Sequence, residues 1–321
     1  MDFVYIIGGL VLLFLGGEGL VRGSVALAYR MGISTLLVSL VVVGFGTSAP
    51  ELIVSINAAL SGSPEIALGN VVGSNIANVL LILGTAGLIT PLLCDSAAVR
   101  RDSLAVIVVS AGLACLSFLD VIDWRAGAMM LLVLFGYLYF AYSSEKNERR
   151  TEQKKAQKDL REHISEDMTP PKDSALLSIV FLIGGLLFLV VGAHYLVEGA
   201  ASIARSFGIS EAVIGLSLIA FGTSLPELAT AIVASIRGHS DVIIGNVLGS
   251  NLFNILSILG VTALIAPLPL SGRIVEIDVW IMLASAAVLF PVILTGHKIS
   301  RLEGAGFVAL YLAYIGFMFV I

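Results

Sequence analysis

Charged side chains are scarce in this sequence. Asp, Glu, Lys and Arg make up 13% of its 321 residues, whereas hydrophobic residues make up 58%. A soluble globular protein carries about 25% charged residues. A chain of this composition cannot hide its apolar surface in one water-soluble core, so we expect a polytopic membrane protein. Its apolar runs are continuous and do not alternate with polar residues, which favours an all-α fold over a barrel.

Residues that usually build catalytic centres are also few. The two cysteines, Cys94 and Cys115, have no motif spacing, so we expect them to be unpaired. The sequence shows no nucleophile–base pair, no metal-ligating His cluster and no phosphate-binding loop. We therefore expect neither an enzyme nor a resident cofactor. Nothing indicates nucleic acid or an obligate protein partner, and the lipid bilayer is the expected environment.

Apolar runs predict ten transmembrane helices, since a span needs roughly 20 mostly apolar residues. The ten runs cover about 2–21, 33–60, 68–90, 103–119, 125–143, 175–197, 211–236, 242–265, 279–296 and 304–321. Between the fifth and sixth runs, residues 144–174 carry eight Lys/Arg and eight Asp/Glu. We expect this segment to be a solvated, partly helical linker.

One long stretch of the sequence occurs twice. Residues 44–84 (the first copy) and 220–260 (the second copy) align at a constant offset of 176, and 21 of the 41 positions are identical. We therefore expect two halves of five spans each, residues 1–143 and 175–321. An odd number of spans in each half turns the second half upside down, which is the inverted-repeat plan of many secondary transporters.

The distribution of positive charge predicts the orientation. If the 144–174 linker is cytoplasmic, 15 of the 18 Lys and Arg residues lie inside, and only Arg125, Arg205 and Arg273 lie outside. The positive-inside rule then places both termini outside a cell membrane.

Four acidic or basic residues outside the repeated stretch have simpler expected roles. Asp102 and Asp278 precede the fourth and ninth spans and are expected to cap them. Glu18 and His194 occupy equivalent places on the first and sixth spans, where we expect satisfied polar positions near helix ends.

Each copy carries polar groups inside an apolar run. Pro50 lacks an N–H and clashes with the carbonyl of Gly46, so the helix should break there, as it should at Pro226. Glu51 and Glu227 have no Lys or Arg nearby in either copy. Oxygen ligands without Cys or His suit Ca²⁺ or Na⁺ better than zinc or copper. The charge of two carboxylates balances one Ca²⁺, and two or three Na⁺ could compensate the same charge. If the two carboxylates were instead protonated, the site would suit proton coupling.

The next span of each copy repeats a second pattern. Asn70, Ser74 and Asn78 are spaced by four and share a helix face, while Gly69 and Gly73 should form a small-residue packing seam. The second copy has the same pattern at Gly245, Asn246, Gly249, Ser250 and Asn254.

These motifs resemble the paired α-repeats of the sodium/calcium exchanger family, within the cation/Ca²⁺ antiporter superfamily. The matching stretches are GTSAPE (46–51) with GNVVGSNIAN (69–78), and GTSLPE (222–227) with GNVLGSNLFN (245–254). The resemblance is to the compact prokaryotic members with ten helices. It implies that the first and sixth helices slide across the other eight. The ligands that it implies are Glu51, Asn78, Glu227 and Asn254, the hydroxyls of Thr47, Ser48, Ser74, Thr223, Ser224 and Ser250, and the carbonyls of Gly44 and Ala220.

We therefore expect a secondary antiporter that exchanges Na⁺ for Ca²⁺ by alternating access and extrudes Ca²⁺. The alternative is a proton-coupled or K⁺-assisted exchanger. Asn254 stands where the potassium-dependent animal branch has Asp, which argues against K⁺ co-transport. No glutamate follows Asn70 or Asn246 within the motif, which argues against the proton/Ca²⁺ branch. A channel would need a symmetric ring around a continuous pore, which two inverted copies do not favour.

Overall fold

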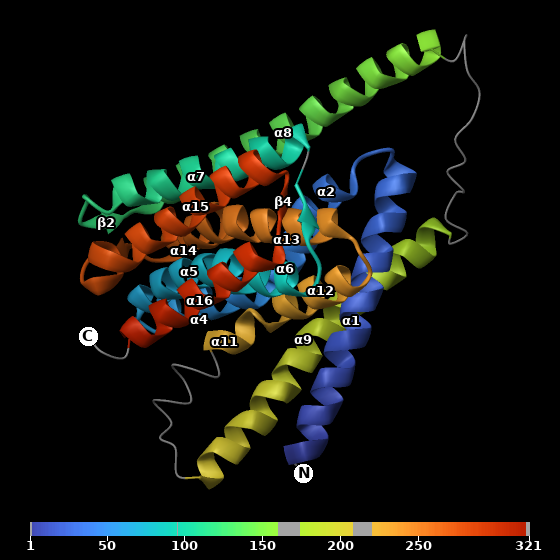
Figure 1. Ribbon diagram of the computed structural model, residues 1–321. Coiled ribbons are helices and arrows are strands. Elements are labelled where there is room, and N and C mark those ends of the chain that lie inside the picture. Colours follow the sequence, from blue (N-terminus) through green and yellow to red (C-terminus); the bar gives the residue numbers. More distant parts are fainter. Residues whose placement is uncertain (1, 95, 160–173, 208–219, 319–321) are drawn as a thin grey trace.

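The computed structural model of the protein describes residues 2–94, 96–159, 174–207 and 220–318, which are almost entirely helical (Figure 1). The helices before the charged linker are α1 (Asp2–Met31), α2 (Thr35–Val38), α3 (Gly44–Thr47), α4 (Ala49–Leu60), α5 (Pro64–Ala77), α6 (Gly84–Ile89), α7 (Ala97–Leu116) and α8 (Trp124–Asp159), with the π-helical turns η1 (Ser39–Val43) and η2 (Asn78–Leu83). The later ones are α9 (Ala175–Ser206), α11 (Ala220–Thr223), α12 (Leu225–Ile236), α13 (Ser240–Leu252), α14 (Leu259–Ile265), α15 (Val279–Gly296) and α16 (Arg301–Met318), with η4 (Phe253–Ile258) and η5 (Ile274–Asp278).

Six helices in the described ranges are long and apolar enough to cross a membrane. They are Asp2–Met31, Pro64–Ile89, Trp124–Asn147, Ala175–Ser206, Ser240–Ile265 and Ile274–Gly296. The bent pair Thr35–Thr47 and Ala49–Leu60 makes a seventh if it is one span. The predicted span 211–236 begins outside the described residues, and its visible part, Leu225–Ile236, is a short apolar helix. The count of ten spans therefore stays a prediction.

Helix α8 continues without a break beyond the predicted end of the fifth span at residue 143. The first part of the predicted linker is thus a helical extension of that span, while residues 160–173 lie outside the described ranges. Glu145 is only 5% exposed and accepts hydrogen bonds from the backbone N–H and the hydroxyl of Ser34. Ser34 in turn caps α2, so the start of α2 is attached to α8.

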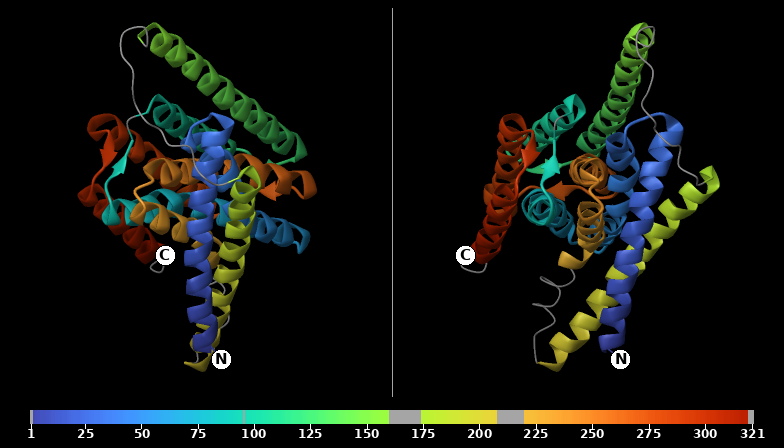
Figure 2. Two further views of the ribbon diagram at one scale, coloured as in Figure 1. Left: turned by 90° about the vertical axis from the view of Figure 1, so that its right-hand side faces the viewer. Right: turned by 45° about the vertical axis from the view of Figure 1, so that its right-hand side comes forward.

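Helices α1 and α9 form a pair that lies along one side of the molecule, at a steep angle to the bundle (Figures 1 and 2). Glycines bring their backbones together. A Cβ on Gly16 would lie 2.7 Å from the Leu189 nitrogen and 2.8 Å from the Gly185 carbonyl oxygen. Gly9 and Gly192 approach each other in the same way. Close backbone contact of this kind is typical of membrane helices that associate through small residues.

The centre of the bundle is the segment formed by α13, η4 and α14. The most apolar stretch of this segment is buried along its whole length. Gly245 and Gly249 pack against α2 and η1, where added Cβ atoms would collide with the carbonyl oxygens of Leu36 and Leu40. The predicted glycine seam of the second copy is therefore confirmed. The stretch equivalent to η1 in the second half is not described, so the seam of the first copy stays a prediction.

Two short antiparallel ladders connect the two halves of the chain. Strand β1 (Leu92–Leu93) pairs with β4 (Lys298–Ile299), and β2 (Val121–Ile122) pairs with β3 (Leu268–Pro269). Each ladder thus joins a loop of the first half to a loop of the second half, which holds helix ends of both halves at a fixed distance.

The predicted capping roles of Asp102 and Asp278 are wrong. Ser96 caps α7, and Asp102 lies inside that helix, where its carboxylate accepts a hydrogen bond from Tyr137 at 2.6 Å. Asp278 makes no capping bond and accepts one from Tyr314 at 3.2 Å. Ser96 already caps α7, and the π-helical turn η5 leads directly into α15, so each carboxylate instead accepts a hydrogen bond from a tyrosine on a neighbouring helix.

We expect Gly249→Ala to destabilise the fold, because the added methyl group collides with the Leu40 carbonyl in a packed core. Overpacking costs about 1–3 kcal/mol. Thermal unfolding of the purified protein in detergent measures the effect. The control is Gly136→Ala on α8, where no described atom lies within 4 Å of an added Cβ. Equal melting temperatures for the two variants would contradict the tight seam.

Candidate ion-binding site

Each copy of the repeated stretch breaks its helix just before its proline. Helices α3 and α4 meet at Ser48, where the chain bends by 41°, and α11 and α12 meet at Ser224. The two serines have ψ values of 4° and 3°, which are not helical. Pro50 and Pro226 occupy the first turn of the new helix, where a missing N–H is tolerated. The predicted break is confirmed in both copies.

The break brings one glutamate from each copy into the protein interior. Glu51 on α4 and Glu227 on α12 are each 1% exposed. The hydroxyl of Ser224 donates to Glu51 Oε1 at 3.3 Å, and the hydroxyl of Ser48 donates to Glu227 Oε1 at 3.4 Å. Thr223 also lies against the Glu51 carboxyl group. Each carboxylate is therefore bound by a serine from the other copy, and the two copies meet here.

A second chain of oxygens extends from the break in the first copy. The Thr47 hydroxyl donates to Asn246 Oδ1 at 3.0 Å and lies 3.5 Å from the Ser250 hydroxyl oxygen. Ser250 donates to the carbonyl of Gly44 at 3.3 Å. Thr47, Asn246 and Ser250 are fully buried. Hydroxyl, amide and carbonyl oxygens thus gather within a few ångströms of each other in a water-poor interior.

The predicted asparagine ligands lie in two π-helical turns. Turn η2 begins at Asn78 and packs against α12, and η4 contains Asn254 and packs against α4. Such turns occur frequently at functional sites. Asn78 donates to Asn251 Oδ1 at 3.1 Å, and Asn254 donates to Asn75 Oδ1 at 3.2 Å. Sequence reasoning missed Asn75 and Asn251, although both copies have an asparagine directly after the motif serine.

Four acceptor oxygens of this cluster have no hydrogen-bond donor among the described residues. They are Oε2 of Glu51 and Glu227 and Oδ1 of Asn78 and Asn254. An unsatisfied buried polar atom costs about 1–3 kcal/mol, so such atoms call for an explanation. The buried polar side chains that the structure describes include no Lys, Arg or His. Unpaired oxygens, two of them on carboxylates, form a ligand set that suits a hard cation.

Most of the predicted ligands belong to this one cluster. Hydrogen bonds or side-chain contacts join Gly44, Thr47, Ser48, Glu51, Thr223, Ser224, Glu227 and Ser250, and the turns that carry Asn78 and Asn254 pack against α12 and α4. Ser74 is buried on α5, and Ala220 is the first residue of α11. The part that each of these residues plays in ion binding stays a prediction.

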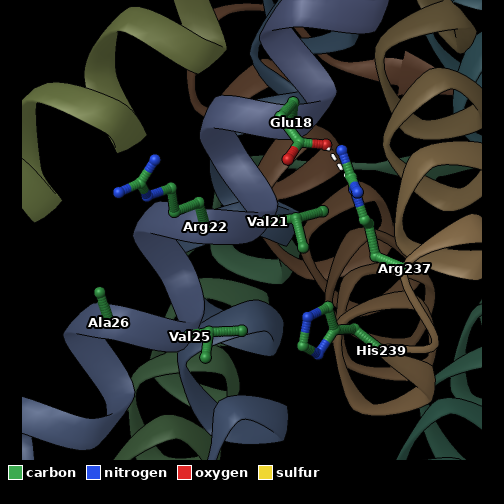
Figure 3. Close-up of a pocket in the computed structure, with 7 residues that line it drawn as sticks. All are labelled: Glu18, Val21, Arg22, Val25, Ala26, Arg237 and His239. Atoms are coloured by element: carbon green, nitrogen blue, oxygen red, sulfur yellow. Dashed lines mark hydrogen bonds and ion pairs between the residues drawn. The ribbon is translucent and has the colours of Figure 1, made fainter. Parts of the chain in front are cut away.

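Glu18 lies in the middle of α1 and not near a helix end, because α1 continues to Met31. Its carboxylate is 2.8 Å from Arg237 Nε, just beyond the end of α12 (Figure 3). This ion pair joins α1 to the bundle. It borders a hollow of about 240 Å³ that Val21, Arg22, Val25, Ala26 and His239 also line.

A second hollow, of about 200 Å³, lies beside α9. It is lined by Pro50, Val190, Ala193, His194, Val197, Gly222 and Thr223. Because Thr223 lies against the Glu51 carboxyl group, this hollow reaches the ion-binding cluster. His194 also lies inside its helix, because α9 continues to Ser206, so its expected place near a helix end is wrong, as it is for Glu18. Its side chain is exposed and lies 3.9 Å from Glu198 on the same helix.

Comparison with known proteins agrees with this geometry. A family model described as sodium/calcium exchanger protein matches residues 1–143 and 177–320. The chain is 34% identical over 263 residues to the inner membrane protein YrbG of Escherichia coli (strain K12), covering 82% of this chain and 79% of YrbG. It is 30% identical over 354 residues to the sodium/calcium exchanger MaX1 of Methanosarcina acetivorans, covering 100% of this chain and 99% of MaX1.

The fold is similar to that of a solved structure. The sodium-calcium exchanger NCX_Mj, soaked with zero Na⁺ and Ca²⁺, superposes with a TM-score of 0.84 and 30% sequence identity. The match covers 99% of this chain and 98% of that chain.

We expect Glu51→Gln and Glu227→Gln each to weaken Ca²⁺ binding by roughly 100-fold or more. Removing one partner of a buried charge pair costs about 3–5 kcal/mol. The measurement is the rise in melting temperature with added Ca²⁺, since a ligand that binds the folded state stabilises it. Glu65→Gln is the matched control, because Glu65 is exposed on the first turn of α5. If Ca²⁺ raised the melting temperature of both variants as much as that of the wild type, the two carboxylates would not be Ca²⁺ ligands.

Proposed function

This chain belongs to the sodium/calcium exchanger family of cation/Ca²⁺ antiporters, and from this premise we propose that it exchanges Na⁺ for Ca²⁺ by alternating access. One observation carries the proposal. Two buried glutamates, one from each copy, are bound by serines of the opposite copy, and one oxygen of each has no donor among the residues that the structure describes. MaX1 and NCX_Mj are named as exchangers, which supports a transporter rather than an enzyme.

The charge of the site suits the two proposed ions. Glu51 and Glu227 supply two negative charges. One Ca²⁺ neutralises them, and two or three Na⁺ can take the place of that Ca²⁺. The remaining ligands are neutral oxygens on separate helices. A flexible oxygen cage suits Ca²⁺, whereas Mg²⁺ requires a rigid octahedron and keeps its waters. Because both ions bind the same carboxylates, the site holds either Ca²⁺ or Na⁺. One ion must leave before the other can bind, so the two are exchanged.

The same carboxylates oppose a leak. Without a cation, the protein would have to carry two bare carboxylates through a dry barrier, and each buried ion costs several kcal/mol. The ion-free protein therefore has a high energy barrier for switching between its outward-facing and inward-facing conformations. Only protein loaded with Na⁺ or Ca²⁺ switches readily, so each ion moves in return for the other.

The two hollows support access from one side at a time. The hollow beside α9 includes Thr223, which belongs to the cluster, whereas the one beside α1 includes no predicted ligand and is bordered by the Glu18–Arg237 pair. We propose that the α1–α9 pair moves along the bundle. This movement closes one of the two routes to the cluster and opens the other. In the predicted orientation, both termini are outside the cell membrane and Arg237 faces the cytoplasm. An inward Na⁺ gradient would then drive Ca²⁺ out.

We expect Na⁺-loaded proteoliposomes to accumulate radioactive Ca²⁺ when diluted into Na⁺-free medium. K⁺-loaded vesicles and vesicles with an outward proton gradient should not, because Asn254 removes a carboxylate that other family members have. Vesicles carrying Glu51→Gln serve as the inactive control. Uptake driven by protons but not by Na⁺ would replace this proposal with a proton-coupled exchanger, and a requirement for K⁺ together with Na⁺ would indicate a K⁺-assisted one.

We expect Glu18→Gln and Arg237→Gln each to change the initial uptake rate two- to fivefold, because the ion pair must break if α1 moves. An exposed pair contributes about 0–1 kcal/mol, so folding should be unaffected. The double variant Glu18→Arg with Arg237→Glu should restore the rate. Glu198→Gln, on the exposed face of α9, is the control. Rates equal to wild type in both single variants would exclude the pair from the transport cycle.

A further inference from the structure

The site asparagines are held by two other asparagines across the boundary between the copies. Asn78 of the first copy donates its amide NH₂ group to Asn251 of the second, at 3.1 Å. Asn254 of the second copy donates to Asn75 of the first, at 3.2 Å. All four side chains are at most 2% exposed. The same arrangement therefore occurs twice, with the roles of the copies exchanged.

Only one of the two possible hydrogen bonds forms in each pair. Two facing amides can each donate and accept, and an arrangement that served stability alone would use both bonds. Here the Oδ1 atoms of Asn78 and Asn254 have no donor within the described parts of the chain, although burial makes this costly. In both pairs the oxygen without a described donor belongs to the predicted ligand, Asn78 or Asn254. It does not belong to the partner, Asn251 or Asn75.

The direction of one pair follows from a neighbouring sulfur. Asn75 Nδ2 lies 3.6 Å from the Sδ atom of Met282 on α15. A thioether sulfur accepts hydrogen bonds and donates none, so it selects the NH₂ end of Asn75. The Oδ1 atom of Asn75 is then directed to Asn254, which must present its own NH₂ group. The Oδ1 atom of Asn254 is not used in this bond and is therefore available to bind a cation.

We propose that Asn75 and Asn251 are positioning residues for ion binding. Each accepts a hydrogen bond from the site asparagine of the other copy and so fixes which end of that amide faces the ion. Without this acceptor, the amide of Asn78 or Asn254 can turn by 180° and present its NH₂ hydrogens, which repel a cation. The inference rests on the proposed function, because it assigns Asn78 and Asn254 to the cation site.

The proposal predicts different results for two replacements of similar size. Asn251→Leu and Asn75→Leu remove the acceptor and should raise the Ca²⁺ concentration for half-maximal uptake about tenfold, the low end of the effect of residues that orient metal ligands. Asn251→Asp and Asn75→Asp keep an acceptor oxygen, so each should raise this concentration less than the matching Leu variant does. The maximal rate should change less than the half-saturation concentration.

A double variant tests whether the effect passes through the ligand. Asn78→Ala removes the amide that Asn251 orients, so adding Asn251→Leu to it should cause no further loss of Ca²⁺ affinity. Coupling of this kind is expected for residues in direct contact. The control is Thr262→Val, which removes a fully buried hydroxyl that binds its own helix at Ile258. It should lower the melting temperature without changing the half-saturation concentration.

The two proposals fail in different ways. If the Leu variants melt earlier but keep the Ca²⁺ half-saturation concentration of wild type, Asn75 and Asn251 are structural only. Additive losses in the Asn78→Ala background also overturn the inference. If wild-type vesicles take up no Ca²⁺ in response to Na⁺, the proposed function fails. The same variants are then compared through the shift in melting temperature caused by Na⁺ or Ca²⁺, whichever stabilises the wild type.

Discussion

The architecture depends on one electrostatic constraint, which is the burial of two carboxylates without a positive side chain beside them. Glu51 and Glu227 are each 1% exposed, and the buried polar groups in the described ranges include no basic residue. Burying an unpaired charge costs several kcal/mol. A cation bound there, as proposed, would remove much of this cost and at the same time stabilise the contact between the two copies. Ion binding and the stability of the centre are therefore linked.

Close helix packing makes this cluster possible. Gly245 and Gly249 let α13 approach η1, and a Cβ on Gly44 would lie only 2.9 Å from the Ser250 nitrogen. The Gly44 carbonyl and the Ser250 hydroxyl meet because of this short distance. Helices α1 and α9 use their own glycines to contact each other, so the molecule combines a tightly packed core with a separate helix pair alongside it (Figure 2).

Two expectations about helices were wrong. The apolar run of α1 stops near Arg22, yet the helix continues to Met31, and the Arg22 guanidinium lies 4.6 Å from the ring centre of Phe181. A charged residue therefore need not end a span when its side chain finds a partner. Asp102 was expected to cap a helix by its place in the sequence, but Ser96, six residues earlier, takes that role. Both errors arise because hydropathy does not report which partner a polar side chain finds.

The sequence by itself determined the membrane environment, the doubled motif, the helix breaks at Pro50 and Pro226, and the oxygen-bearing residue types of the buried cluster. These follow from composition and from the missing N–H of proline, which act locally. Only the tertiary structure decided that Ser48 and Ser224 bind the glutamate of the opposite copy, and that Asn78 and Asn254 donate to Asn251 and Asn75 across the same boundary. These contacts join residues more than 170 positions apart, so the packing of the two copies determines them and no local pattern encodes them.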